Sequence, residues 1–490
     1  AMGQASTRSS APGFCTCHAR PEPAGEDEEN ALHVRGVVKG EALGKANIFG
    51  DKGSTAPTSA SGSPAVSPSG QIGGWEGEEV EEGGCGGGRR RLSVVSGGNG
   101  MSRTGSIDFA KEEITLLHAE PNDAVLLSKG FTELFQSERL RERRAVSLYS
   151  MTDTEGCSRA SFKEKCEEVI IPPGRDSDES MLIDWLTELG FGWACKKGLK
   201  DASPNQDSFS ILAVEDEFIL VGVYDGHGSA GHDVSQFVRE RIVKLFLMHA
   251  KRKTDVKAAL TDAFLQCQAA IEAGMPRLRA MESGTTCTLV HIDFETQQLA
   301  VAHVGDARAA LGKRRRPEGG TSEEVRLEVD DLTTDHKPNL PEERERIENA
   351  DPPGRVLFDG CVNYRVFAQD GLYPGLNMSR ALGDVTGHRM CGLTAEPDVH
   401  IVDLRPLLSE YADLTLFVCT DGVWEFIKTE EAFKLASEVP GKGPRGMVSK
   451  LCGEAYRRWM ADSDGEVTDD ITAVCLHLHE ALRRPRSQGA

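Results

Sequence analysis

The chain lacks several features that would indicate particular classes of protein. It has no apolar run of about 18 residues, the length a helix needs to cross a bilayer, so no membrane-spanning helix is expected. Its first residues show no basic flank followed by an apolar stretch, so no secretory signal is expected. Positive charge is in deficit, because 56 lysines and arginines against 77 aspartates and glutamates give a net charge of −21. Such a chain repels phosphate backbones, and nucleic acid is therefore not an expected partner.

The 13 cysteines show no disulfide or metal pattern. Several of them, such as Cys287, Cys419 and Cys475, lie inside apolar runs, which is typical of reduced and buried thiols. The cluster Cys15-Thr16-Cys17-His18 has no second Cys/His pair at the spacing of a zinc finger, so zinc is not expected.

Four segments are expected along the chain. Residues 1–110 are rich in Gly, Ser, Pro and Glu and poor in aromatics, so they cannot bury enough apolar surface to offset the entropy of ordering. Residues 111–179 have a charged, helix-like pattern that is expected to form a partly helical linker or docking segment. A compact domain is expected over residues 180–480, followed by a tail over 481–490.

Within the expected domain, pairs of strands alternate with long helices. Residues 208–214 and 218–224 are predicted to form a β-hairpin, and apolar residues at helical spacing predict a helix over 231–250. Further elements are predicted as helices near 255–273, 340–349, 429–438 and 446–460, and as strands at 287–294, 299–304, 414–419 and 471–477. This pattern favours antiparallel sheets covered by helices, an α+β fold.

Four aspartates, Asp207, Asp225, Asp421 and Asp469, each lie beside an apolar, strand-like run. Carboxylates at strand ends can converge from distant parts of a chain, and oxygen-only sites of this kind suit Mg²⁺ and Mn²⁺. A pair of such ions can activate water and stabilise the charge of a displacement at phosphorus. The pattern therefore indicates metal-assisted phosphoester hydrolysis, although Asp225-Gly226 and Asp421-Gly422 would each alone also fit an ordinary turn.

Nine short motifs occur in a fixed order over about 300 residues, as follows: Lys197-Gly198 with Asn205-Gln206-Asp207; Asp225-Gly226-His227-Gly228; Ser283-Gly284-Thr285-Thr286; Gly305-Asp306-Ala307-Arg308; Asp335-His336-Lys337-Pro338; Ser379-Arg380-Ala381-Leu382-Gly383-Asp384; Glu396-Pro397; Thr420-Asp421-Gly422-Val423-Trp424; and Asp469-Asp470-Ile471-Thr472. In these motifs the chain strongly resembles the metal-dependent serine/threonine phosphatases of the protein phosphatase 2C family. The resemblance does not extend to residues 1–150.

The resemblance implies a four-layer α-β-β-α sandwich, in which two antiparallel sheets are flanked by helices. It also implies a site for two Mn²⁺ or Mg²⁺ ions at one end of the sandwich. Asp225 would bridge the two ions and the carbonyl of Gly226 would bind one of them. Asp421 and Asp469 would complete the shell of the other ion.

Further roles follow from the same resemblance. Asp207 would orient metal-bound waters, His227 would be the general acid, and Asp306 would bind a weaker third ion. The implied reaction is direct attack of a metal-bridging hydroxide on phosphoserine or phosphothreonine of a protein substrate, without a phosphoenzyme.

Two positions depart from the family pattern. Gln206 stands where a glutamate is common, which removes one negative charge from the expected metal site. The basic residue that binds substrate phosphate is displaced by the insertion 201–204, so either Lys197 or Lys200 could serve. Lys197 is favoured because it lies in the matching Lys-Gly pair, and it would act as a point charge.

Two inserted segments are also expected near the site. The run Lys313-Arg314-Arg315-Arg316 is expected to form an exposed basic loop, either simply solvated or attracting phosphorylated or acidic partners. Residues 345–378 fall where the family has a mobile flap beside the active site, which would govern the choice of substrate.

The amino terminus carries lipidation signals. Met2-Gly3-Gln4-Ala5-Ser6-Thr7 fits the N-myristoylation pattern, although Ala1 in front of Met2 would block the modification. One myristoyl chain binds a membrane only marginally, and palmitoylation at Cys15 or Cys17 would make the anchor stable. A location on the cytoplasmic side of a membrane, such as the plasma membrane, is therefore expected. Ser93 follows an arginine run and is a candidate phosphorylation site.

Two alternatives to a protein phosphatase remain at this stage. A pseudophosphatase would bind partners without catalysis, and Gln206 and the displaced lysine support it, whereas the four aspartates oppose it. A hydrolase of small phosphoesters would use the same metal chemistry. Whichever of these functions it has, the chain is expected to be a monomer.

Overall fold

The computed structural model describes residues 144–151, 164–165, 167–170, 179–200, 204–274, 279–315, 326–360, 363–439 and 441–483. All of these belong to one compact unit of the chain. The expectations for the leader, including Gly3, Cys15, Cys17 and Ser93, lie outside the described residues, as does most of the expected tail. Across the described ranges, no helix has both the length and the apolar character required to cross a membrane.

Two antiparallel sheets form the centre of the fold. The larger sheet has, in spatial order, β15 (Asp398–Asp403), β8 (Gln298–Val304), β7 (Cys287–Asp293), β5 (Phe218–His227), β4 (Asp207–Val214), β1 (Ala145–Ser150) and β2 (Glu167–Ile170), with β6 (Gly284–Thr285) joining β5 to β14 (Leu382–Gly383). The second sheet has the order β10 (Leu327–Asp331), β9 (Arg308–Arg315), β16 (Tyr411–Cys419), β17 (Ile471–His477) and β3 (Phe191–Lys196).

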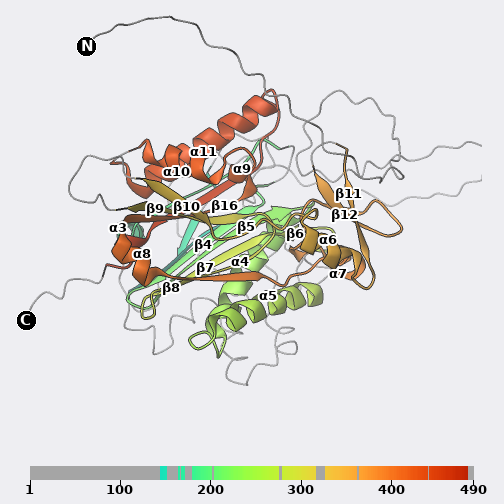
Figure 1. Cartoon of the computed structure of the whole chain (residues 1–490), viewed down its shortest axis with the longest axis horizontal. Helices are drawn as coiled ribbons and strands as arrows, with labels where there is room; N and C mark the ends of the chain where they lie inside the picture. Colours follow the sequence, from blue (N-terminus) through green and yellow to red (C-terminus); the bar gives the residue numbers. More distant parts are fainter. Residues whose placement is uncertain are drawn as a thin grey trace, which may run out of the picture. The chain divides into compact units, whose positions relative to one another are not determined.

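Helices cover the outer faces of both sheets (Figure 1). Helices α4 (Gly231–Met248) and α5 (Val256–Ala273) pack on the larger sheet, and α9 (Asp421–Trp424), α10 (Thr429–Ser437) and α11 (Gly443–Asp462) pack on the second sheet. The remaining helices described are α3 (Glu179–Glu188), α6 (Pro341–Glu348), α7 (Val385–Met390), α8 (Leu404–Glu410) and α12 (Leu478–Ala481). The expected four-layer α-β-β-α architecture is confirmed.

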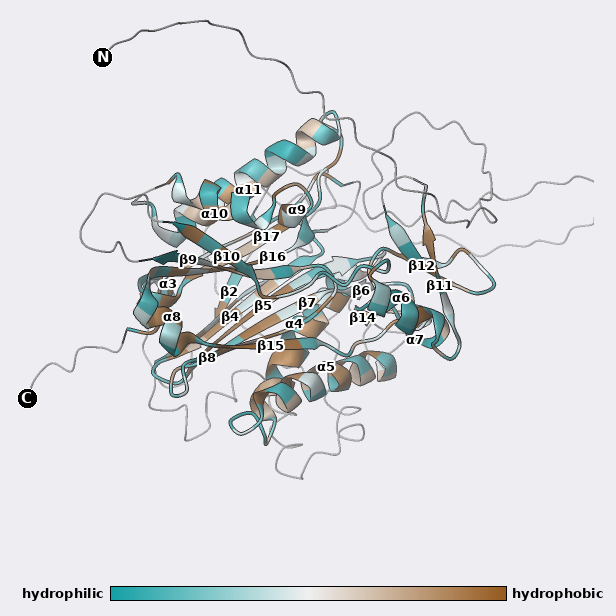
Figure 2. Cartoon of the chain, viewed as in Figure 1, coloured by the Kyte–Doolittle hydropathy of each residue, from teal (hydrophilic) through white to brown (hydrophobic). Residues whose placement is uncertain are grey.

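Alternating side chains along the central strands produce these layers. On β5, Leu220 and Tyr224 face the core under α4 and α5, whereas Val221 and Val223 face the core between the two sheets. This is the period-2 alternation of a strand that is buried on both faces. Figure 2 shows the consequence, because apolar residues gather on the central strands and α4 whereas the outer helix α11 is more hydrophilic.

The folded region begins before residue 180. Strand β1 pairs with β4 over Ala145–Tyr149, and β2 extends the same edge of the larger sheet. The segment 111–179, expected to be a partly helical linker, therefore contributes two strands to the sandwich. At the other end, α12 includes Ala481, the first residue of the expected tail.

The described part of the basic run 313–316 is not an exposed loop, so that prediction is wrong. Residues Lys313, Arg314 and Arg315 lie on β9, between β10 and β16. Carboxylates on those neighbouring strands pair with them, for example Asp330 at 2.6 Å from Lys313 and Glu328 at 2.9 Å from Arg315. Cross-strand ion pairs thus neutralise a run that resembled a basic loop.

The inserted region 345–378 contains a small sheet of its own. Strands β11 (Gly354–Phe358), β12 (Tyr364–Ala368) and β13 (Pro374–Leu376) form an antiparallel three-stranded sheet. Its buried face packs with Ile347 of α6 and with Cys391. The mobility and the role in substrate choice that the resemblance implies for this region stay predictions.

Candidate active site

Three carboxylates from separate elements converge at one end of the sandwich. Asp225 lies near the end of β5, Asp306 lies in the turn between β8 and β9, and Asp421 begins α9 directly after β16. One carboxylate oxygen of each lies within 4.8 Å of the others, and all three residues are buried. Like charges at this separation repel strongly in a poorly solvated place, so a cation is needed to stabilise them.

An ammonium group supplies part of that positive charge. The Nζ of Lys337 donates to Asp306 Oδ2 at 2.6 Å. Burial, the largest contribution, acts to lower the pKa of Lys337, but attraction by Asp306 and Asp421 outweighs it and raises the pKa. The oxygen-only donor set, with net negative charge, fits a hard divalent cation such as Mn²⁺ or Mg²⁺.

Asp207 lies next to this cluster. As the first residue of β4 it stands opposite Asp225 in the antiparallel register. Its Oδ2 accepts a hydrogen bond of 2.9 Å from the hydroxyl of Thr420, which also accepts one from the backbone N–H of Thr472. The carboxylate orientation of Asp207 is therefore tied to the residue that precedes Asp421.

Asp469 lies in the loop before β17, outside the group of three converging carboxylates. The ammonium of Lys200 pairs with its carboxylate and lies 3.6 Å from Asp470 Oδ2. The neighbouring Asp470 accepts from the backbone N–H groups of Gly198 at 2.7 Å and Gln206 at 2.9 Å. Asp470 thereby joins the two ends of the 198–206 segment.

Gly226 is held where no side chain would fit. A Cβ at this position would collide with the backbone of Gly231 and with the carbonyl of Gln206. Its N–H donates to that Gln206 carbonyl at 3.2 Å. A glycine is required for this close approach of backbones, and the metal-binding role predicted for its carbonyl stays a prediction.

His227 is paired with a second buried carboxylate. Its Nε2 lies 2.5 Å from Asp384 Oδ2, and among the described residues its Nδ1 has no hydrogen-bond partner. A Cβ on Gly284 would collide with both side chains of this pair. The motif Asp225-Gly226-His227-Gly228 thus supplies a histidine whose ring is oriented by Asp384.

Lys197, the predicted substrate-binding lysine, and Gln206, the substituted glutamine, both donate hydrogen bonds to backbone carbonyls of the protein. Lys197 is buried, and its Nζ donates to the carbonyl of Gly198 at 3.4 Å. Lys200 is more exposed and adjoins Asp469. The Nε2 of Gln206 donates to the carbonyl of Gly228 at 2.6 Å, so this amide supports the loop that carries His227.

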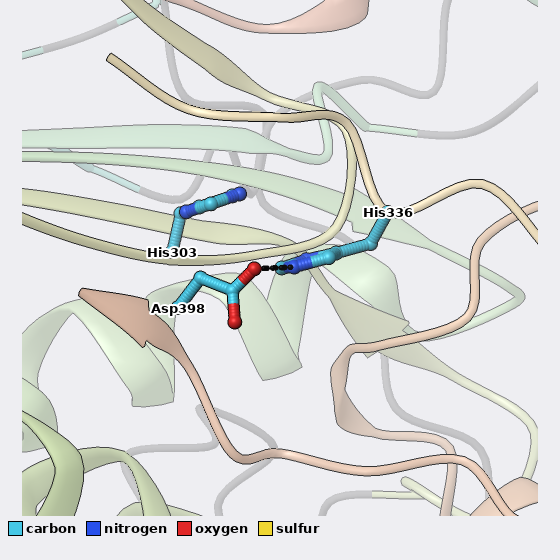
Figure 3. Close-up of side chains that lie close together, drawn as sticks. All are labelled: His303, His336 and Asp398. Atoms are coloured by element: carbon cyan, nitrogen blue, oxygen red, sulfur yellow. Dashed lines mark hydrogen bonds and ion pairs between the residues drawn. The ribbon is translucent and has the colours of Figure 1, made fainter. Parts of the chain in front are cut away.

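A second cluster also has the composition of a metal site. Figure 3 shows His303 and His336 lying face to face, with Asp398 hydrogen-bonded to His336. The two rings are 4.4 Å apart and within 5° of parallel. Imidazole lone pairs lie in the ring plane, and parallel planes do not meet, so the two rings cannot direct lone pairs at one ion.

Hydrogen bonds already use both ring nitrogens of His336 and one ring nitrogen of His303. The N–H of Gly305 donates to His336 Nδ1 at 3.1 Å, which leaves His336 Nε2 to donate to Asp398 at 3.2 Å. His303 Nε2 contacts the carbonyl of Thr334 at 2.9 Å. Burial and the neighbouring His336 lower the pKa of His303 to about 4. The cluster is therefore a structural link, and it positions the turn that carries Asp306.

Sequence reasoning did not single out three residues that the structure places around the carboxylates. Asp384 and Lys337 lie inside motifs that resemble the family, so their position in those motifs was the available signal. Lys165, whose Nζ donates to the backbone carbonyls of Asn205 and Asp207, lies outside every motif, and no sequence pattern pointed to it.

The chain matches the family model for protein phosphatase 2C over residues 193–464. It is 34% identical over 297 residues to "Probable protein phosphatase 2C 48" of Oryza sativa subsp. japonica, covering 56% of this chain and 80% of the relative. It is 32% identical over 405 residues to "Probable protein phosphatase 2C 34" of Arabidopsis thaliana, covering 79% of this chain and 97% of the relative. The chain therefore belongs to the protein phosphatase 2C family, whose members are metal-dependent serine/threonine phosphatases.

Among solved structures, serine-threonine phosphatase 2C from Toxoplasma gondii is similar with a TM-score of 0.46 and 21% sequence identity. The match covers 56% of this chain and 90% of that chain. The family assignment rests on the family model and the curated relatives.

Proposed function

We propose that the converging carboxylates hold two Mn²⁺ or Mg²⁺ ions, and that the ions serve the hydrolysis of phosphoserine and phosphothreonine in protein substrates. The observation that carries this proposal is the convergence of Asp225, Asp306 and Asp421 within 4.8 Å. Asp225 would be shared between the two ions. Asp469 would complete the set of ligands around one of them once Lys200 moves aside. Asp306 would bind a weaker third ion. When bound, such ions activate water as a nucleophile and neutralise charge at the phosphoryl group.

The protein's own residues have distinct tasks in this proposal. Asp207, oriented by Thr420, would hold a water in place for in-line attack. His227, oriented by Asp384, would donate a proton to the departing serine or threonine oxygen. Lys200 or Lys197 would attract the substrate phosphate. Lys200 has the more exposed side chain, and its ammonium would have to leave both Asp469 and Asp470 to reach the phosphate.

The test is phosphate release from a phosphothreonine peptide by the full chain, with Mn²⁺ and with EDTA, beside an aryl phosphate of similar charge. Release that requires Mn²⁺ and favours the peptide is the expected result. Release from the aryl phosphate alone would indicate a hydrolase of small phosphoesters, and none from either substrate would indicate a non-catalytic binding protein.

We further propose that a myristoyl group on Gly3, with palmitoylation at Cys15 or Cys17, holds the enzyme on the cytoplasmic side of a membrane. The support is the sequence pattern after Met2, together with the two nearby thiols. Mass spectrometry of protein whose translation starts at Met2 should find the lipid on Gly3, and Gly3→Ala should move the protein to the soluble fraction. An unmodified Gly3 in protein from its native cell would remove the proposal.

A further inference from the structure

A lysine from outside the family-matched region is buried beneath the active-site end of the sandwich. Lys165 is 3% exposed. Its Nζ donates to the carbonyl of Asn205 at 3.2 Å, to the carbonyl of Asp207, and to the hydroxyl of Ser208 at 3.4 Å. A buried amine is costly unless its N–H groups find acceptors, and these three oxygens provide them.

The segment around Lys165 is attached to the second sheet as well. The backbone N–H of Lys165 donates to the carbonyl of Cys195 at 2.8 Å. Glu164 forms a β-bridge with Lys196, and the two side chains pair at 3.3 Å. The family match begins at residue 193, so Glu164 and Lys165 lie before the matched residues.

The acceptors of Lys165 belong to the turn that leads into β4. Asp207, the first residue of that strand, stands opposite Asp225. The carbonyl of Gln206, between two of the Lys165 acceptors, accepts from Gly226 at 3.2 Å and from the hydroxyl of Ser235 at 2.7 Å. One amine therefore holds the backbone that sets the position of Asp207 relative to Asp225 and Gly226.

We propose that Lys165 is a positioning residue for the metal site: by holding the carbonyls of Asn205 and Asp207, it fixes the turn that places the Asp207 carboxylate beside Asp225. This inference rests on the proposed function, because it assumes that these carboxylates bind divalent ions.

Electrostatics and geometry predict opposite effects of removing this amine. Loss of whatever positive charge the amine carries near Asp207 would by Coulomb's law alone tighten the binding of a divalent cation. Loss of the positioning contacts would weaken binding, because carboxylates that are no longer held must be ordered by the ion. The sign of the change in affinity therefore separates positioning from simple charge.

The experiment is calorimetric titration of Mn²⁺ into the full chain, comparing the wild type, Lys165→Met and Lys196→Met. Methionine keeps the unbranched apolar stem of the side chain and removes the terminal amine with its donors. Lys196→Met is the matched control, because it removes the ion pair of the adjacent Glu164 without touching the Asn205 or Asp207 carbonyls. We expect Lys165→Met to raise the Kd for Mn²⁺ about tenfold, as is typical when support of metal ligands is lost, and Lys196→Met to change it less than about twofold.

An unchanged or tighter Mn²⁺ affinity in folded Lys165→Met would overturn the inference, and so would an equal weakening in the control. If Lys165→Met does not fold at the temperature of the titration, Lys165→Gln replaces it. Glutamine keeps an N–H donor, and we expect at least about a threefold weakening, with the same outcomes overturning the inference. A wild type that binds no Mn²⁺ would instead contradict the proposed metal site itself.

Discussion

Two clusters in the described part of the chain place three potential ligands within 4.8 Å, yet they differ in what holds them together. Asp225, Asp306 and Asp421 bring like charges to one point, which costs free energy unless a cation is present. In the cluster of His303, His336 and Asp398, parallel rings stack and hydrogen bonds use the ring nitrogens. The spacing of ligand atoms therefore does not distinguish the two clusters, whereas the excess negative charge on buried oxygens favours the first as the proposed metal site.

A histidine paired with a carboxylate accompanies each cluster. The pair of His227 and Asp384 lies beside the aspartate cluster, and the pair of His336 and Asp398 lies within the second cluster. His227 and Asp384 are both buried and lie 2.5 Å apart at the active-site end. His336 and Asp398 lie 3.2 Å apart, and Asp398 is mostly exposed. Matched substitutions in the two pairs provide the sharpest experimental contrast.

The largest effect is expected from Asp225→Ala. It removes the carboxylate that would be shared between the two ions, and we expect phosphate release from a phosphothreonine peptide with Mn²⁺ to fall by at least about a thousandfold. The heat of Mn²⁺ binding should be lost in the same variant. Substantial Mn²⁺-dependent activity in the variant would mean that the cluster is not the metal site.

Asp384→Asn should affect the rate in a way that depends on the leaving group. General acid catalysis contributes roughly a hundredfold or more when the departing oxygen is basic, and little when it is a stable phenolate. We therefore expect kcat for the phosphothreonine peptide to fall about a hundredfold, and kcat for p-nitrophenyl phosphate to fall by less than about tenfold. Equal losses for the two substrates would show that Asp384 does not act through a proton donor.

Asp398→Asn is the matched substitution in the second cluster and should affect stability alone. It weakens contacts with His336 and Arg380, and since Asp398 is mostly exposed, we expect a loss of about 0.5–1.5 kcal/mol in the free energy of unfolding. Urea unfolding measures this loss, and kcat should stay within about twofold of the wild type. A large fall in kcat at full stability would assign this cluster to catalysis.

The smallest effect is expected on how the free energy of unfolding falls at low pH. Burial, the largest contribution, acts to raise the pKa of Glu343, but hydrogen bonds from Arg380 and Arg346 outweigh it and lower the pKa to about 2. A depressed carboxyl pKa contributes stability that is present above the unfolded value of about 4.5 and is lost as the pH falls toward about 2.

Glu343→Gln should therefore reduce the slope of unfolding free energy against pH between about pH 5 and pH 3. Urea unfolding at several pH values measures this slope. Glu348→Gln, in an exposed pair with Arg344, is the control, and it should leave the slope nearly unchanged. An identical slope in wild type and Glu343→Gln would contradict the assignment.

Sequence patterns identified some elements and missed others for physical reasons. The hairpin of β4 and β5 was predicted because each strand is apolar and a short turn separates them. Strand β9 was missed, because the residues of its second half, Lys313, Arg314 and Arg315, have charges that only the neighbouring strands neutralise. Strands β1 and β2 were missed because they complete a sheet edge whose partner strand, β4, begins at Asp207, more than 50 residues after β1 ends.

For the site, the sequence by itself determined the family and the carboxylates proposed to supply the metal chemistry, because those residues lie in short motifs at strand ends. Only the tertiary structure decided which side chains surround them. Lys165 meets Asn205 across 40 positions, His227 meets Asp384 across 157, and Asp470 meets Gly198 across 272. Such contacts depend on how the two sheets and their loops pack, and no local pattern of residues records that packing.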